Sequence, residues 1–299
     1  MPDRNFKTKY DNWISIVNTA IDRLLYFDEC PQKTVFEAMK YSLSAGGKRL
    51  RPILALAVCE LLEGNENEII PFACAIEMIH TYSLIHDDLP AMDNDDYRRG
   101  RLTNHKVFGE AIAILAGDGL LNTAFEIMLD ETLKSGINLL NKLKAINLIA
   151  ASAGVKGMIG GQTIDMESEG KKIDSKLLKT MHRCKTGALI KAPIISSAYI
   201  CKAENGILSV LEEYSKHIGL AFQIKDDILD VEGDSKVMGK NAGSDMENTK
   251  TTFITLYGID KSKRMLADLI NKAVECMGIF GDNGLFLKEL ALYISNRKY

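Results

Sequence analysis

Residues 71–88 read PFACAIEMIHTYSLIHDD, an apolar run that ends in two aspartates. Its apolar residues recur at spacings of three and four, which is typical of a helix packed inside a protein core. Proline is favoured in the first turn of a helix, so we expect this helix to begin at Pro71. The segment therefore predicts a buried helix that carries acidic side chains at its carboxyl end.

Similar apolar spacing recurs along most of the chain. The other expected helices span residues 52–62, 110–129, 137–155, 174–186, 192–201, 208–230 and 261–278. Glycine-rich and charge-rich stretches predict loops at 44–48, 94–104, 167–172 and 233–251. Because no repeat or linker divides the chain, residues 1–299 are expected to form a single all-α domain, a bundle of helices that bury their apolar faces against one another.

The composition limits the classes of function. The chain has 299 residues, 46% of them hydrophobic, and a net charge of −3, which does not predict a nucleic-acid partner. The first residues lack an apolar signal region, and no uncharged apolar stretch of about 18 residues occurs, so we expect neither secretion nor stable membrane insertion. Six cysteines without a C-x-x-C pair predict reduced thiols in a cytoplasmic protein.

Two acidic clusters each follow an apolar run. Their members are Asp87, Asp88 and Asp93 in the first cluster, and Asp226, Asp227 and Asp230 in the second. Crowded carboxylates repel one another unless a cation neutralises them, and Mg²⁺ often bridges one or two carboxylates to substrate phosphates. Asp226 and Asp230 are four residues apart and share a helix face. In the first cluster, Pro90 is expected to distort the helix and let Asp93 approach from the loop side. A solvated helix end is the alternative for either cluster alone.

Basic side chains accompany these acids. GGKRLRP, residues 46–52, supplies Lys48, Arg49 and Arg51 after two glycines that allow close approach of the backbone. Further basic residues are Arg98 and Arg99 after the first acidic cluster, Lys185 in KTG, and Lys240 in GKNAG. Arginine can grip a diphosphate through its planar fork, and lysine acts as a point charge. Surface charge, or a helix-entry turn for the glycines, explains each of these features when it is taken alone.

Five motifs in this order resemble the trans-prenyl diphosphate synthases, and most closely the bacterial farnesyl diphosphate synthases. They are GGKRLRP, HTYSLIHDDLPAMDNDDYRRG, GGQTIDME, KTGALI and FQIKDDILDVEGD, between Ala38 and Thr252. The resemblance implies an isoprenoid-synthase bundle around a central apolar tunnel, a homodimer, and three Mg²⁺ ions with Mn²⁺ as an alternative. It also implies head-to-tail condensation of isopentenyl diphosphate with dimethylallyl or geranyl diphosphate, giving mainly farnesyl diphosphate.

The resemblance further implies a role for each matching residue. The six aspartates of the two clusters would bind Mg²⁺, and the catalytic set would be Asp87, Asp93, Lys185 and Asp226. The allylic diphosphate would contact Arg98, Lys185, Gln223 and Lys240. Isopentenyl diphosphate would contact Lys48, Arg51, His80 and Arg99, although a core histidine is the alternative for His80. Gly47 and Thr186 would also contact substrate.

The length of the product is expected to depend on Tyr82 and Ser83, which precede Asp87 by five and four residues. If this helix lines the tunnel, their side chains can form its floor. In the family these positions limit the tail of the product, and an aromatic side chain there accompanies short products. Relatives often have a Tyr-Pro pair where this chain reads TTFITLYG at 251–258, so the role of Lys250 is left open.

The implied reaction begins when the allylic substrate loses diphosphate and leaves a stabilised cation. Cationic groups would stabilise the departing charge, the isopentenyl double bond would attack, and the released diphosphate would take the proton. One alternative is a geranylgeranyl diphosphate synthase. Another is a terpene cyclase, whose second metal motif usually contains Asn, Ser and Glu instead of DDILD. A non-catalytic partner subunit is the third, but such subunits tend to lose these aspartates.

Overall fold

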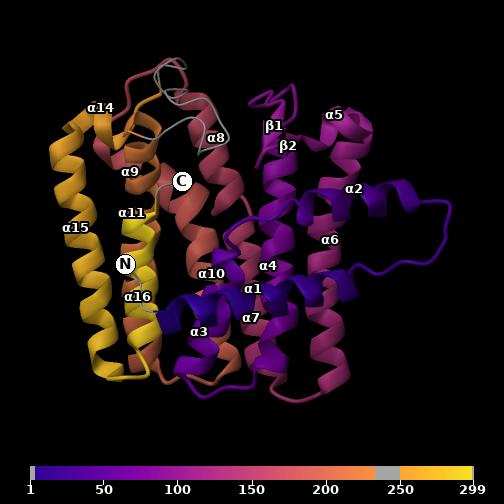
Figure 1. The fold of residues 1–299 in the computed structure, drawn as a ribbon, viewed down its shortest axis with the longest axis horizontal. Coiled ribbons are helices and arrows are strands. Elements are labelled where there is room, and N and C mark those ends of the chain that lie inside the picture. Colours follow the sequence, from indigo (N-terminus) through magenta and orange to yellow (C-terminus); the bar gives the residue numbers. More distant parts are fainter. Residues whose placement is uncertain (1–3, 233–249, 298–299) are drawn as a thin grey trace.

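The computed structural model describes residues 4–232 and 250–297, and 78% of the chain is helical. The first helices are α1 (Arg4–Leu24), α2 (Lys33–Leu43), α3 (Leu50–Leu61), α4 (Glu66–Asp87), α5 (Asn104–Phe108), α6 (Glu110–Ser135), α7 (Leu139–Ala153) and α8 (Met158–Ser168). They are followed by α9 (Ser175–His182), a π-helical turn (Arg183–Gly187), α10 (Ala188–Ile200), α11 (Asn205–Glu232), α14 (Phe253–Tyr257), α15 (Ile259–Cys276), a 3₁₀ turn (Met277–Phe280) and α16 (Leu285–Asn296). The expected all-α fold is confirmed (Figure 1).

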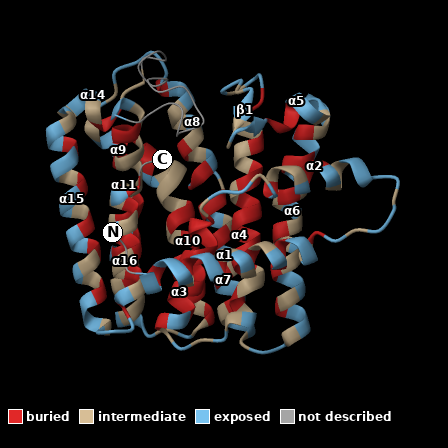
Figure 2. Ribbon diagram, in the orientation of Figure 1, coloured by how far each residue is buried: buried red, intermediate tan, exposed pale blue. Residues whose placement is uncertain are grey.

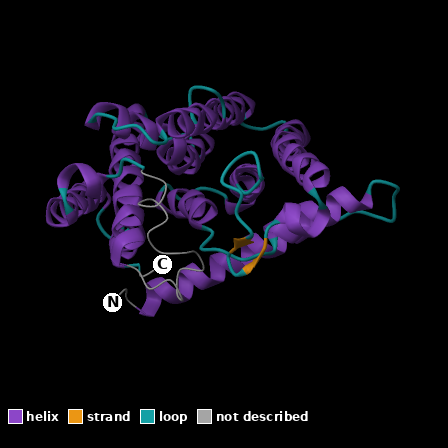
Figure 3. Ribbon diagram, turned by 90° about the horizontal axis from the view of Figure 1, so that it is seen from above, coloured by secondary structure: helices purple, strands orange, loops and turns teal. Residues whose placement is uncertain are grey.

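Strands β1 (Tyr97–Arg98) and β2 (Arg101–Leu102) form one short antiparallel hairpin. Figure 3, seen from above, shows how small this hairpin is beside the helices. The hairpin lies in the segment 94–104 that was expected to be a loop. Its two turn residues, Arg99 and Gly100, have φ values of 54° and 75°. Two positive φ values in a two-residue turn match the right-handed twist of the flanking strands.

The core of the bundle is formed by helices that are apolar on more than one face. Helices α3, α4 and α10 pack on one another, and Figure 2 shows long buried stretches in them. In α3, the side chains of Ile53, Leu54 and Leu56 have no exposed surface. Helix α1 crosses this group and buries Phe6, Tyr10, Trp13 and Val17 along one side. The helix that ends in the first acidic cluster, α4, is therefore held on several sides by apolar packing.

Helix α4 begins five residues earlier than expected, so the predicted start at Pro71 is wrong. The Asn65 side chain caps the helix by accepting a hydrogen bond from the Asn67 backbone N–H at 3.1 Å. Glu66 and Glu68 in the first turn suit the positive end of the helix dipole. These cap signals explain the earlier start, and Pro71 lies inside the helix.

Other boundaries differ from the expected ones by a few residues, and several helices were not expected. The unexpected helices are α1, α2, α5, α8, α14 and α16. The expected loop at 44–48 is confirmed, whereas α8 continues to Ser168. Of the expected loop at 233–251, all but the last two residues lie outside the described part of the chain.

Two helices, α4 and α6, are long and apolar enough to cross a membrane by length and composition alone. In α4, 67% of the most apolar stretch is buried inside the protein, so α4 is a core helix. In α6 only 33% is buried. Helix α6 therefore leaves an apolar face uncovered.

Candidate active site

The first acidic cluster lies where α4 ends. Asp87 is the last residue of the helix, and the Asp93 backbone N–H donates to the Asp87 carbonyl at 2.9 Å. The chain therefore turns back and brings Asp93 beside Asp87, as expected. Pro90 follows the end of the helix and does not distort its interior, which corrects that part of the expectation.

Asp87 lies in an environment that disfavours an isolated carboxylate. Burial raises the pKa of Asp87 to about 6, against the lowering effect of Lys185, and Asp93 adds to the rise. A cation at this position would offset both effects, because it stabilises the ionised form. The environment of Asp87 therefore suits a metal ligand.

The second aspartate of each pair is bound to protein donors. Asp88 is 3% exposed and accepts a hydrogen bond from Arg98 Nε at 2.9 Å. Asp227 is also 3% exposed and accepts from Gln223 Nε2 at 3.1 Å and from the Phe253 backbone N–H at 2.8 Å. Asp88 and Asp227, which were expected to bind metal, therefore accept hydrogen bonds from protein groups in this structure.

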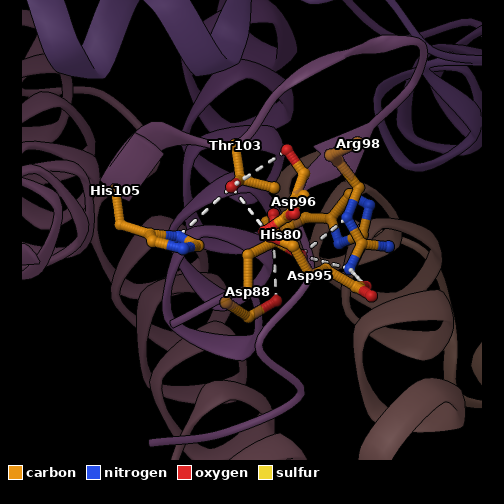
Figure 4. A network of polar contacts seen from close by, with 8 residues as sticks. His80, Asp88, Asp95, Asp96, Arg98, Thr103 and His105 are labelled. Carbon is orange, nitrogen blue, oxygen red and sulfur yellow. Dashed lines mark hydrogen bonds and ion pairs between the residues drawn. The ribbon is translucent and has the colours of Figure 1, made fainter. Parts of the chain in front are cut away.

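The contacts of Arg98 link the first cluster to the hairpin. Arg98 also donates to Asp95 Oδ2 at 3.1 Å, and the Thr103 hydroxyl donates to the Asp95 carbonyl at 2.8 Å. Figure 4 shows these contacts together with the approach of Thr103 to His105. Arg98 was expected to contact the allylic diphosphate, but in this structure its guanidinium lies on Asp88 and Asp95.

Gly47 and Arg99 come together, although they are far apart in the chain. Arg99 Nη1 donates to the Gly46 carbonyl. A Cβ atom at position 47 would lie 2.6 Å from Arg99 Cζ, so a side chain there would displace the guanidinium. Gly47 also has a φ of 119°, which favours glycine. The glycine pair therefore makes room for a cation.

Three cations and a neutral histidine surround this position. Burial lowers the pKa of Lys48 to about 8, and nearby Arg297 adds to the effect. Burial also lowers the pKa of Arg51 to about 10, and Arg51 Nε has no hydrogen-bond partner among the described residues. The pKa of His80 is held well below its usual range by burial and then by Arg51 and Arg99. These cations lie close enough to repel one another, and a bound anion would relieve that repulsion.

Arg49 has a different role from its neighbours. It is 4% exposed, and its Nη1 lies 3.0 Å from Glu77 Oε1. Its Nε also donates to Asn18 Oδ1 at 3.0 Å. Arg49 therefore ties α1 and α4 together and does not face a ligand.

A second polar group is formed around the π-helical turn. Lys185 Nζ lies 2.6 Å from Asp165 Oδ2, and the Thr186 hydroxyl donates to Gln223 Oε1 at 3.0 Å. Gln223 in turn donates to Asp227, so the turn is connected to the second acidic cluster. Lys240 lies outside the described residues.

Two residues that the sequence did not single out also reach the site. Arg297 Nη2 lies 2.7 Å from Asp226 Oδ1, and its guanidinium stacks on Phe222 at 3.9 Å. Asp165 belongs to the motif GGQTIDME and forms an ion pair with Lys185, a role that the motif alone did not predict. No local pattern marks Arg297, because its partner is 71 residues away.

Tyr82 and Ser83 lie on α4 below Asp87. Tyr82 is 5% exposed, its ring meets His86 edge-on at 5.7 Å, and its hydroxyl has no hydrogen-bond partner in the described chain. The Ser83 hydroxyl donates to the His80 carbonyl at 2.8 Å. An unpaired buried hydroxyl is costly unless water or a ligand can reach it.

The residues present fit Mg²⁺ without forming a complete site for it. Within residues 4–232 and 250–297, no three metal-ligating side chains come close enough to hold a metal by themselves. Mg²⁺ commonly takes one or two carboxylates and completes its coordination with water and substrate phosphates. The carboxylates of Asp87 and Asp226, beside the cations described above, match that kind of site.

Comparisons with known proteins agree with this geometry. Residues 32–280 match the polyprenyl synthetase family. The chain is 48% identical over 266 residues to a farnesyl diphosphate synthase of Micrococcus luteus, covering 89% of this chain and 90% of that protein. It is 45% identical over 265 residues to a geranylgeranyl diphosphate synthase of Cyanophora paradoxa, covering 88% and 87%.

A solved structure of an FPP/GFPP synthase from Zymomonas mobilis has a similar fold. Its TM-score is 0.87 at 35% identity, and the match covers 97% of this chain and 99% of that one. The family match spans well over half of the chain, and the relatives are matched over most of their length. The chain therefore belongs to the polyprenyl synthetase family and is a transferase that elongates prenyl chains.

Proposed function

We propose that this enzyme joins isopentenyl diphosphate head to tail to dimethylallyl and geranyl diphosphates, with farnesyl diphosphate as its main product. The observation that carries the proposal is that two acidic clusters, at the ends of α4 and α11, accompany two separate polar groups. Lys48, Arg51 and Arg99 form one group, and Lys185 and Thr186 belong to the other. Two groups of this kind suit a reaction that uses two diphosphates.

We assign the metal ligands to Asp87 and Asp93 on one side, and to Asp226 and Asp230 on the other. Mg²⁺, when bound, would neutralise the diphosphate and stabilise the charge of the leaving group. Asp88 and Asp227 would instead hold Arg98 and the start of α14 in place. The proposal includes three Mg²⁺ ions in total, the number that the family resemblance implies.

The two polar groups would bind different substrates. Lys185, Thr186 and Gln223 would hold the allylic diphosphate and stabilise its charge as it leaves. Lys48, Arg51 and Arg99 would hold isopentenyl diphosphate, and neutral His80 could donate or accept a hydrogen bond there. The apolar interior would exclude water from the allylic cation.

Tyr82 would limit the product to fifteen carbons. A further five-carbon unit in an open tunnel gains about 4 kcal/mol, at about 0.8 kcal/mol per buried CH₂. Forcing the tail against a packed ring costs about 1–3 kcal/mol and removes that gain. The burial of Tyr82, which is 5% exposed, supports this placement, because a packed ring resists displacement by a longer tail. Geranylgeranyl diphosphate is the second candidate product, since relatives of both kinds match this chain.

A homodimer also belongs to the proposal. Apolar side chains are exposed on neighbouring helices α6 and α7, including Leu115, Leu133 and Leu140 at 53%, 74% and 67%. A second copy of the chain could cover this face, as is usual for symmetric dimers. Light scattering should give twice the mass of the chain, and a monomer at micromolar concentration would contradict the dimer.

The catalytic proposal is tested by incubating the enzyme with dimethylallyl diphosphate, isopentenyl diphosphate and Mg²⁺. Longer prenyl diphosphates are expected as products. Hydrocarbon products from geranyl diphosphate alone would indicate a terpene cyclase. No turnover by folded protein would favour a non-catalytic subunit.

A further inference from the structure

Helix α8 lies directly against the π-helical turn that carries Lys185. A Cβ atom added to Gly161 would lie only 2.1 Å from the Lys185 backbone nitrogen, so only glycine permits this approach. Asp165 follows Gly161 by four residues and shares its helix face. The same face of α8 therefore brings two backbones together and directs a carboxylate toward the Lys185 side chain.

The Asp165 carboxylate is shared by two lysines. Its Oδ2 lies 2.6 Å from Lys185 Nζ and 3.9 Å from Lys250 Nζ. The Asp165 side chain is 13% exposed, so these charges are poorly screened by water. Burial tends to raise the pKa of Asp165, but Lys185 and then Lys250 outweigh it and hold that pKa below its usual value. Asp165 thus stays ionised and allows two ammonium groups to lie close together.

Lys185 also lies within the electrostatic reach of the first acidic cluster, because its charge acts on Asp87. A lysine is a point charge on a flexible stem, and a fixed counter-ion restricts the positions that this charge can take. We propose that Asp165 is a positioning residue that holds Lys185 and Lys250 together as a pair of cations for the allylic diphosphate. The inference rests on the proposed function, since it takes Lys185 as a ligand of that diphosphate.

The proposal also gives Lys250 a place in the site. Besides Asp165, Lys250 contacts Glu169, at 3.5 Å. Both carboxylates belong to the segment around the end of α8, so this segment anchors Lys250 from one side. The chain has TTFITLYG after Lys250, where relatives often have a Tyr-Pro pair. Lys250 is nevertheless held in place by Asp165 and Glu169.

The test removes the charge of Asp165 and keeps its shape. Asp165→Asn should weaken the binding of geranyl diphosphate by roughly 10- to 100-fold, measured by calorimetry with Mg²⁺ and without isopentenyl diphosphate. The KM for isopentenyl diphosphate should stay close to that of the wild type. Glu212→Gln is a matched control, because Glu212 forms a 2.7 Å ion pair with Lys191 between α11 and α10. This control should bind geranyl diphosphate like the wild type.

The outcomes separate this inference from the function on which it rests. Equal binding of geranyl diphosphate by the wild type and Asp165→Asn would overturn the positioning role. Equal weakening for both substrates would also overturn it, because that pattern indicates general damage to the fold. A wild-type protein that does not bind geranyl diphosphate at all would instead refute the proposed function.

A second variant keeps the inference testable if Asp165→Asn folds poorly. Lys250→Gln leaves the contact between α8 and the π-helical turn in place. It should weaken geranyl diphosphate binding and leave the KM for isopentenyl diphosphate close to that of the wild type, because Lys250 is one of the two lysines that Asp165 holds. Wild-type affinity in Lys250→Gln would contradict the shared role.

Discussion

The carboxylate of Asp227 accepts a hydrogen bond from the Phe253 backbone N–H at 2.8 Å, while its neighbour Asp226 pairs with Arg297. Phe253 is the first residue of α14, where backbone N–H groups lack partners within the helix. Two adjacent aspartates of one motif therefore have different roles. Asp227 stabilises the start of a helix, and Asp226 pairs with a cation at the site.

This difference predicts different effects on stability. Asp227→Ala should lower the free energy of unfolding by about 1–3 kcal/mol, because it leaves buried donors without an acceptor. Asp226→Ala should change stability less, since the Asp226 side chain is 41% exposed and its partner Arg297 keeps a second acceptor, the Phe222 carbonyl at 2.8 Å. Urea unfolding of both variants checks this, and equal losses would contradict the division.

The metal assignment predicts a large loss of activity without a loss of fold. Asp87→Ala and Asp226→Ala should each lower kcat by at least about 10²–10³-fold, because a preorganised charge contact is lost. Circular dichroism should show a helical spectrum like that of the wild type. Near-normal kcat in either variant at saturating Mg²⁺ would show that the assignment is wrong.

The two polar groups predict opposite effects on the two substrates. Arg51→Ala should raise the KM for isopentenyl diphosphate more than that for geranyl diphosphate, since Arg51 belongs to the group around Gly47. Lys185→Ala should have the opposite preference. Steady-state kinetics with each substrate varied in turn makes the comparison, and the same change for both substrates in both variants would refute the partition.

His182 predicts a dependence of stability on pH. Burial lowers the pKa of His182 from 6.5 to about 4, so the folded chain does not take up the proton that the unfolded chain binds below pH 6.5. Its contribution is lost as pH falls from 6.5 to about 4, and can reach about 3 kcal/mol. Unfolding of His182→Gln between these pH values should show a shallower decline than the wild type. Parallel curves would contradict the prediction.

The sequence predicted those parts of the fold and site that depend on local patterns. Helices such as α4 and α10 are apolar on several faces, so their spacing was enough to find them. Helix α1 buries one side and exposes a charged one, and it was missed because polar residues predominate in its sequence. Asp165 and Arg297 could not be assigned, because their partners Lys185 and Asp226 are 20 and 71 residues away and only the fold brings them together.

The proposed function is tested most sharply by the product length of the wild type and of Tyr82→Ala, measured by chromatography of the dephosphorylated products. We expect a fifteen-carbon main product from the wild type and a shift toward twenty carbons in the variant, because the ring no longer blocks the tail. Thermal unfolding of the variant checks that it is folded. A twenty-carbon main product from the wild type, or an unchanged pattern from folded and active Tyr82→Ala, would contradict the proposed role of Tyr82.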